Sequence, residues 1–433
     1  MELLKRRCGH LIALMGLIGS APAPLLSEES AKAPTPHRVL VSTDIGGTDP
    51  DDFQSMVHLL VYSDSLQIEG LISSPYGPGR KEDILTVIDR YESDFPALRR
   101  HSPEYPEPNA LRQITKQGAV DRAPYDGFAQ STQGSEWLIA CARRDDPRPL
   151  HILVWGGLED LAQALHDAPD IRTKLRVYWI GGPNKKWSAD AYQYILTHHR
   201  HLWFIESNAT YRGWFVGGDQ SREWDNTRFV TQHIAGHGAL GEFFHSQLGG
   251  TIKMGDTPSV AWLLQGELSE PTAPGWGGRY APAWERPVLD LDRMPNESER
   301  MELFGILELS LPFSEGVTLN PKAFLVVDNQ RLPGDFSVPG RVRFRFCPKA
   351  AKTYHFRIDS SLDSLHNSTG SIRATPPSQT IANQPVATLP HWWTDLPDPQ
   401  WSEGPHWGAK TVNRWRREFL NDFAERMART STE

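Results

Sequence analysis

The sequence is poor in cysteine and contains no long run of basic residues. Only 3 of its 433 residues are cysteines, and two of these, Cys141 and Cys347, lie beyond residue 36. A disulfide between the two is compatible with the sequence, which does not fix the geometry of the pair. Because the net charge is −8 and basic residues are not clustered, we do not expect binding to a nucleic acid polymer through phosphate neutralisation.

The N-terminal apolar run, Leu11–Ile18, is too short to cross a membrane. It follows the basic residues Lys5–Arg7 and precedes the small residues Ser20–Ala23, which is the order found in secretory signal peptides. We therefore expect a signal peptide at residues 1–24, a linker at 25–36, and a secreted or periplasmic protein that leaves the membrane after cleavage. A frayed amphipathic end is the alternative interpretation.

Residues 37–285 alternate between strand-like and helix-like segments. Short apolar runs typical of strands occur at His37–Val41, Ile68–Ser73, Leu150–Trp155, Leu175–Ile180 and Leu202–Ile205. Amphipathic runs typical of helices occur at Phe53–Tyr62, Glu82–Tyr91, Ser135–Arg143, Leu158–His166 and Asp190–Thr197. This alternation predicts an α/β fold with a mostly parallel sheet flanked by helices.

The pattern changes after this domain. Residues 286–385 carry little helix signal, and Arg341–Phe346 alternates between polar and apolar residues with a period of two. We interpret this region as an inserted β-sandwich module of immunoglobulin-like type. Residues 386–433 are expected to form a C-terminal helical segment that packs on the first domain, because apolar residues recur every three to four positions from Gly408 to Arg429.

A turn rich in glycine and aspartate follows the first expected strand. It places four carboxylates, those of Asp44, Asp49, Asp51 and Asp52, within nine positions. The turn lacks the Gly-Lys-Ser/Thr ending of a P-loop and the alternating acids of an EF-hand. Its carboxylates repel one another unless they are solvated or bound to a hard cation such as Ca²⁺. The alternative is a solvated turn in which two of the acids interact favourably with a helix dipole.

Three later segments carry further polar groups at the expected ends of strands or starts of helices. Glu159 follows a strand and a glycine turn, Glu206 and Asn208 lie two positions apart after another strand, and Asp256 precedes a helix. Each of these residues could instead be a helix cap or a turn former.

Together and in this order, the segments resemble the nucleoside hydrolase superfamily. More closely, the chain is similar to the exported branch described as cellulose-binding proteins with a nucleoside-hydrolase-like domain. The resemblance covers roughly residues 38–285 and 390–428. The motifs that carry it are Thr43–Gly47, Ile180–Asn184, Asn208–Phe215, Trp276–Tyr280 and Ala409–Arg416.

This resemblance implies a Ca²⁺ site. Asp44, Asp52 and Asp256 would provide carboxylate oxygens, and Glu159 would provide its backbone carbonyl. Waters and a sugar diol would complete the six to eight oxygens that Ca²⁺ prefers. Water made more acidic by the ion would lose its proton to Asp44 and attack the anomeric carbon.

The resemblance also implies a sugar site and a set of partners. Asp51 would face the sugar diol, with Glu206 and Asn208 holding other hydroxyls. The expected partner is a small-molecule glycoside or carbohydrate. A homo-oligomer is compatible with the sequence, and the oligomeric state stays open.

Two features depart from the superfamily pattern. The aspartate turn is expanded by Gly47–Pro50, so the roles of Asp49, Asp51 and Asp52 could shift by a residue or two. Gly255 stands where many nucleoside hydrolases have a histidine that helps to protonate the leaving group. The general acid is therefore unassigned.

The sequence thus predicts an exported hydrolase of glycosyl bonds, N-glycosidic by family resemblance, with Asp44 as catalytic base. One alternative is a non-catalytic cellulose- or carbohydrate-binding protein on a hydrolase scaffold. Tryptophans such as Trp392 or Trp407 could form a sugar platform, or they could pack the terminal helix against the first domain. Another alternative is an O-glycosidase acting on glycan fragments, which would need a second carboxylic acid with a raised pKa.

Overall fold

The computed structural model describes residues 35–75, 77–314, 320–377 and 386–431. The predicted signal peptide and most of the predicted linker lie outside these residues. Among the described helices, none is both long enough and apolar enough to cross a membrane.

The main sheet has eight strands and is parallel except at one edge. In spatial order the strands are β3 (Thr115–Gln117), β2 (Leu66–Ser73), β1 (His37–Thr43), β4 (Leu150–Trp155), β5 (Leu175–Ile180), β6 (Trp203–Ser207), β16 (Trp392–Asp395) and β7 (Tyr280–Pro282). The one antiparallel pair is β16 with β7. The central strands are buried along almost their whole length, as the unbroken apolar runs of a parallel sheet require.

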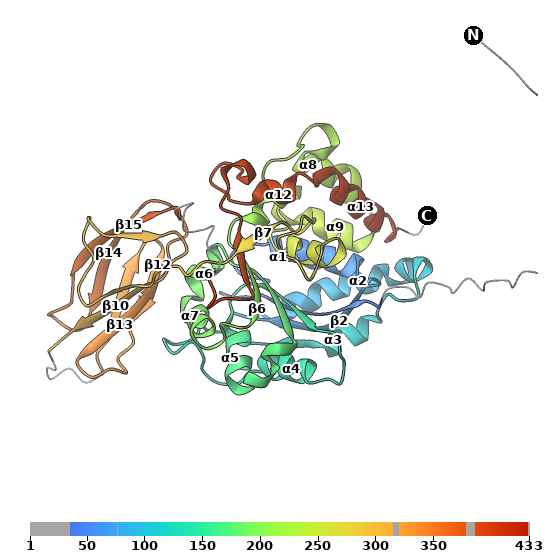
Figure 1. The fold of residues 1–433 in the computed structure, drawn as a ribbon. Helices are drawn as coiled ribbons and strands as arrows, with labels where there is room; N and C mark the ends of the chain where they lie inside the picture. The colour runs from blue at the N-terminus through green and yellow to red at the C-terminus, as the bar shows by residue number, and fades with distance from the viewer. Residues whose placement is uncertain (1–34, 76, 315–319, 378–385, 432–433) are drawn as a thin grey trace, which may run out of the picture. The chain divides into compact units, whose positions relative to one another are not determined.

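Helices cover both faces of the main sheet (Figure 1). One apolar core joins the sheet to α1, α2, α9, α10 and α13, and a second core joins its other face to α4, α5 and α7. The helices are α1 (Asp51–Val61), α2 (Lys81–His101), α3 (Pro108–Gln113), α4 (Gln133–Ala142), α5 (Glu159–Asp167), α6 (Pro183–Trp187), α7 (Ala189–His198), α8 (Asn226–Phe229), α9 (Gly238–Ser246), α10 (Thr257–Leu264), α12 (Ala409–Asn413) and α13 (Arg416–Ala428). The predicted α/β fold with a mostly parallel sheet is confirmed.

The C-terminal segment is not purely helical, which corrects the sequence interpretation. Before its helices it forms strand β16, which pairs with β6 on one side and β7 on the other. The predicted continuous helix from Gly408 to Arg429 is interrupted between α12 and α13. Trp392 lies in the core, where it stacks on Phe204 with ring centroids 4.5 Å apart, so its aromatic surface is used for packing.

Residues 289–375 form two further sheets with one apolar core between them. The strands are β8 (Leu289–Leu291), β9 (Arg300–Glu302), β10 (Leu307–Pro312), β11 (Ala323–Val327), β12 (Gln330–Pro333), β13 (Arg341–Phe346), β14 (Thr353–Ser360) and β15 (Thr369–Thr375). Along β13 buried and half-buried residues alternate, as the period of two predicted. The sandwich is mostly antiparallel, but its edge strands β8 and β9 pair in parallel with β10 and β15.

The two cysteines in the described part of the chain are both buried and free. Cys141 lies in α4 and Cys347 follows β13. The disulfide that the sequence left open is therefore not formed in this structure.

The order of the strands explains the position of Asp44, the first candidate site residue. Strand β1 lies between β2 and β4. After β1 the chain adds β2 and β3 on one side of it, and then β4, β5 and β6 on the other side. In open α/β sheets ligands bind beyond the carboxyl ends of the strands, where the winding direction reverses. Asp44 follows β1 directly at this reversal point.

Candidate metal centre and sugar site

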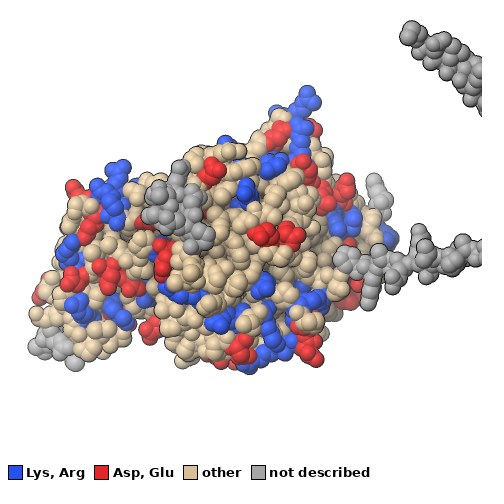
Figure 2. Space-filling model, viewed as in Figure 1, with Lys and Arg blue, Asp and Glu red and all other residues tan. Residues whose placement is uncertain are grey.

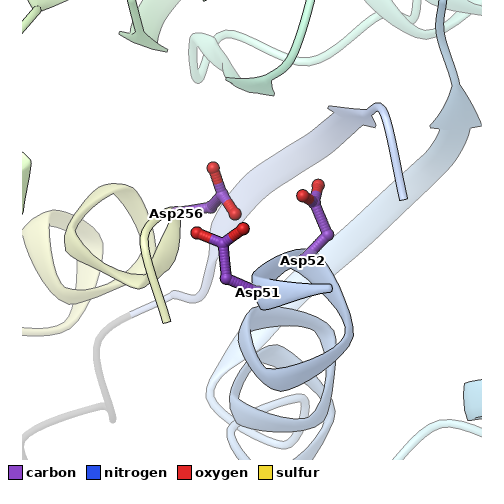
Figure 3. A group of neighbouring side chains, drawn as sticks. All are labelled: Asp51, Asp52 and Asp256. Atoms are coloured by element: carbon purple, nitrogen blue, oxygen red, sulfur yellow. The ribbon is translucent and has the colours of Figure 1, made fainter. Parts of the chain in front are cut away.

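Three aspartates from two helix starts converge on one point. Asp51 and Asp52 lie in the first turn of α1, and Asp256 directly precedes α10. One carboxylate oxygen from each lies within 4.8 Å of the others, and all three residues are buried. Figure 3 shows the three carboxylates directed into the same space. A buried group of like charges is unstable unless protons or a cation compensate it.

Asp256 is not a helix cap, although it occupies the cap position. Its side chain makes no capping hydrogen bond to α10. Its Oδ2 atom is buried and has no hydrogen-bond partner among the described residues. Buried polar atoms are almost always paired, so an unpartnered carboxylate oxygen beside two further carboxylates fits a hard cation with oxygen ligands.

Asp44 completes the acidic cluster from the end of β1. Gly156, just after β4, permits its close approach, because a Cβ at position 156 would lie 2.8 Å from the Cβ of Asp44. The carboxyl group of Asp44 is within hydrogen-bonding reach of that of Asp52. The hydroxyl of Thr43 donates to Oδ1 of Asp52 from the other side. The strand end therefore fixes both carboxyl groups.

Burial raises the pKa of all four carboxyl groups, and repulsion between them raises it further. The pKa of Asp44 rises to about 8 and that of Asp51 to about 7. The pKa values of Asp52 and Asp256 are also well above the ordinary range, for the same two reasons. A cation bound here would reverse this effect, because it stabilises the ionised forms.

The aspartates line a cavity of about 450 Å³. Asp49 lies at its exposed rim, where it forms an ion pair with Lys253. Asp51, in contrast, points inward with Asp52 and Asp256. Among the three neighbouring candidates in the turn, the structure thus brings Asp51 and Asp52 together and leaves Asp49 outside the group.

Gly255 is in direct contact with Asp51. Its amide nitrogen donates to Oδ2 of Asp51 over 3.2 Å, and a Cβ at position 255 would lie 2.3 Å from the same oxygen. The preceding residue, Met254, is buried with a φ of 46°, a strained value for a large side chain. Asp51 therefore occupies space that a side chain at position 255 would need.

Glu206 is not brought to the aspartate cavity. It is buried and forms an ion pair with Lys185 at 2.7 Å and with Arg286 at 3.3 Å. Tyr192 and Asn208 donate to its carboxylate at 3.0 and 2.7 Å. These cations and hydrogen bonds outweigh the effect of burial and lower the pKa of Glu206, so its oxygens are already satisfied without a sugar.

Asn208 and Glu159 also lie outside the lining of the aspartate cavity. Asn208 lines a neighbouring cavity, and its Oδ1 accepts a hydrogen bond from the Gly182 amide. Glu159 is at the start of α5, where its carboxylate accepts from the Ser188 hydroxyl at 3.0 Å. Its charge raises the pKa of Asp44 slightly. Metal binding by the Glu159 carbonyl stays a prediction.

Sequence reasoning missed several residues that line the two cavities. Lys186, Arg212 and Lys349 line the aspartate cavity, and Asp395 lines its neighbour. Asp395 accepts hydrogen bonds from the amides of Asn208, Ala209 and Thr210. Arg212 lies within a motif that carried the family resemblance, but nothing in the pattern around Lys349 or Asp395 signalled a site.

Several solved structures are similar to this chain at low sequence identity. The chain is 18% identical to a nucleoside hydrolase-related hypothetical protein from Saccharophagus degradans that is associated with carbohydrate metabolism; the match covers 79% of this chain and 100% of that one, with a TM-score of 0.49. It is 13% identical to a purine-preferring ribonucleoside hydrolase from Gardnerella vaginalis, over 90% and 98% of the two chains, with a TM-score of 0.40. It is 15% identical to an inosine-uridine preferring nucleoside hydrolase from Bacillus anthracis, over 52% and 81%, with a TM-score of 0.34. A search of curated proteins finds no match to this chain.

A family model covers more than half of the chain. It is described as the nucleoside hydrolase-like domain of cellulose-binding Sde182, and it matches residues 38–280. This range contains six of the eight strands of the main sheet, β1 to β6, and includes Asp44, Asp51, Asp52 and Asp256. The chain therefore belongs to the family of cellulose-binding Sde182 proteins with a nucleoside hydrolase-like domain.

Proposed function

We propose that the protein is an exported, Ca²⁺-dependent hydrolase of glycosyl bonds, N-glycosidic in type. The observation that carries the proposal is the buried group of Asp51, Asp52 and Asp256, with one oxygen of Asp256 left without a partner. The donor set contains only oxygen, which suits Ca²⁺ better than a softer transition metal. Asp52, Asp256 and Asp44 would hold the ion.

The roles of the residues follow from their positions. A bound Ca²⁺ would lower the pKa of water in the cavity. Asp44, held at the end of β1, would accept the proton of the attacking water. Asp51, oriented by the Gly255 amide, would accept a hydrogen bond from a sugar hydroxyl. The carboxylates would stabilise the positive charge that develops at the anomeric carbon.

Two observations favour a second candidate, a carbohydrate-binding protein without catalysis. Glu206, expected to hold sugar hydroxyls, is neutralised by Lys185 and Arg286. The described lining of the aspartate cavity also contains no histidine to protonate a leaving group. A protein that binds sugar diols through Ca²⁺ would need neither a free carboxylate at Glu206 nor a general acid.

Calorimetric titration with Ca²⁺ followed by a turnover assay tests the proposal. The panel should contain nucleosides and oligosaccharides, with release of free base or reducing sugar as readout. We expect Ca²⁺ to bind and one substrate class to be hydrolysed. Asp256→Asn should abolish Ca²⁺ binding, and Asp44→Asn should abolish turnover. Asp49→Asn is the matched control, because Asp49 lies outside the group and should affect neither.

The outcomes separate the candidates. Ca²⁺ and sugar binding without turnover would support the binding protein. Reducing-sugar release from oligosaccharides alone would indicate O-glycosidic cleavage. Unchanged Ca²⁺ affinity in both Asp256→Asn and Asp44→Asn would show that the metal site is not here.

A further inference from the structure

A second cavity adjoins the aspartate cavity. It has a volume of about 500 Å³. Pro183, Arg212 and Lys349 line both cavities, so the two spaces meet along these residues. Each is within the usual size range of small-ligand pockets. A ligand whose sugar diol lies at the aspartates can therefore extend past Arg212 into the second cavity.

Two cationic side chains, Arg212 and Lys349, lie at the junction of the cavities. Arg212 is half-buried, and its guanidinium lies over the face of Tyr211, at 5.2 Å from the ring centroid. Its charge also lowers the pKa of Asp51. Neither side chain makes an ion pair or a hydrogen bond to any described residue. On the face shown in Figure 2, basic and acidic side chains are interspersed.

The other charged groups of the second cavity are compensated. Arg286 forms ion pairs with Glu206 and with Glu302, the latter at 3.0 Å. Asp395 is buried, and its carboxylate accepts hydrogen bonds from the three successive backbone amides at residues 208–210. The charge left without a partner at the junction of the cavities is therefore positive.

The second cavity also offers an apolar surface. Trp407 is half-buried and lines its wall together with Pro405. Aromatic and proline side chains present flat apolar faces, on which the C–H face of a sugar ring can pack. The cavity thus combines an apolar wall with two free cations.

We propose that the junction of the two cavities binds an anionic group of the ligand, a carboxylate or a phosphate carried on a sugar. This inference rests on the proposed function, because it assumes that the sugar itself lies at the aspartates. Arg212 donates paired N–H groups to the anion, a geometry that suits both oxyanions. Lys349, from the inserted sandwich, contributes a second charge, so the module takes part in ligand selection.

Fluorescence or calorimetric titration with matched pairs of probes, at saturating Ca²⁺, tests this inference. One pair is D-galactose and D-galacturonate, and the other is D-glucose and D-glucose 6-phosphate. We expect at least one anionic probe to bind about tenfold more tightly than its neutral partner, the effect of one charge-assisted hydrogen bond. The two pairs distinguish a carboxylate site from a phosphate site.

Variants assign the preference to these residues. Arg212→Gln should remove most of the preference for the anion and leave the affinity for the neutral probe within about twofold. Lys349→Gln should reduce the preference in part. Arg90→Gln and Lys322→Gln are matched controls, because both residues are exposed, line neither cavity and make no ion pair with described residues. Neither should change the preference.

Equal affinity for both members of both pairs would overturn the inference, as would a preference that survives the double substitution of Arg212 and Lys349. An equal loss of affinity for neutral and anionic probes in Arg212→Gln would show that Arg212 only supports the aspartates. The proposed function fails separately: if Asp256→Asn leaves Ca²⁺ binding and turnover intact, the metal assignment is wrong whatever the charge preference.

Discussion

The amide nitrogen of Gly255 lies 3.2 Å from Oδ2 of Asp51 and donates a hydrogen bond to it. The contact joins the loop before α10 to the first turn of α1. Because a Cβ at position 255 would lie 2.3 Å from this oxygen, no residue with a side chain can replace Gly255 without moving Asp51. The glycine at position 255 and the position of Asp51 are therefore linked.

Gly255→Ala should displace Asp51 and weaken binding of sugar by about tenfold or more, the loss expected when a hydrogen bond to a charged group is broken. Titration with the best-binding probe measures this. In an Asp51→Ala background the clash is absent, so adding Gly255→Ala should cost little more. Additive losses in the double variant would contradict the steric explanation.

Asp256→Asn should stabilise the metal-free protein. The folded pKa of Asp256 is raised well above its ordinary value, so ionisation of this group destabilises the fold as pH rises. At pH 8 in chelator we expect a gain in the free energy of unfolding of at least about 1.4 kcal/mol, the equivalent of one pKa unit. Added Ca²⁺ should stabilise the wild type and leave the variant unchanged. Chemical denaturation with and without Ca²⁺ measures both effects, and a variant less stable in chelator would contradict the prediction.

Lys185→Met should destabilise the protein by about 3 kcal/mol, because it leaves the buried Glu206 with a weaker set of partners. Ca²⁺ affinity should stay unchanged, since Glu206 does not line the aspartate cavity. Equilibrium denaturation and calorimetry measure the two quantities. If stability is retained while sugar affinity changes, Glu206 contacts the ligand after all.

His58 should make the protein sensitive to mild acid. It is buried among Tyr62, Trp214 and Phe423, and burial lowers its pKa to about 3. Because its ordinary pKa is 6.5, the unfolded chain binds the proton first as pH falls. Stability should therefore decrease between pH 6.5 and 3, by up to about 1.4 kcal/mol per pH unit.

Replacing His58 tests this source of acid sensitivity. His58→Leu should flatten the dependence of the unfolding free energy on pH in this range. It should also raise stability at pH 5, because Nδ1 of His58 is buried without a partner among the described residues. An unchanged slope would assign the acid sensitivity to other groups.

The alternating pattern of the first domain was enough to predict its fold. β4 and β5 begin and end where the apolar runs do, because a strand covered on both faces is built mostly from apolar residues. β16 was missed because the sequence Trp392–Asp395 is short and forms a strand only through its pairing with β6 and β7. Pairing across such a distance leaves no local pattern to detect.

The candidate site was predictable where it follows strand ends and helix starts. Asp44, Asp51 and Asp52 are close in sequence. Asp256 is far from them in sequence and was assigned to the same site from the resemblance to the family. The pairing of Glu206 with Lys185 was not predictable. A Glu-x-Asn segment after a strand has the same sequence pattern whether its carboxylate binds a sugar or a buried cation. Lys349 reaches the site only through the packing of the inserted sandwich.

Strand β16 also constrains the order in which the chain can fold. Thr394 in this strand donates to the carbonyl of Glu206, 188 positions earlier, and β7 has no other partner in the main sheet. The main sheet therefore cannot be completed until residues 392–395 have been synthesised. Until then, the edge of β6 stays open to pair with another chain. A chain truncated before residue 392 should accordingly aggregate through this edge, while the complete chain closes it.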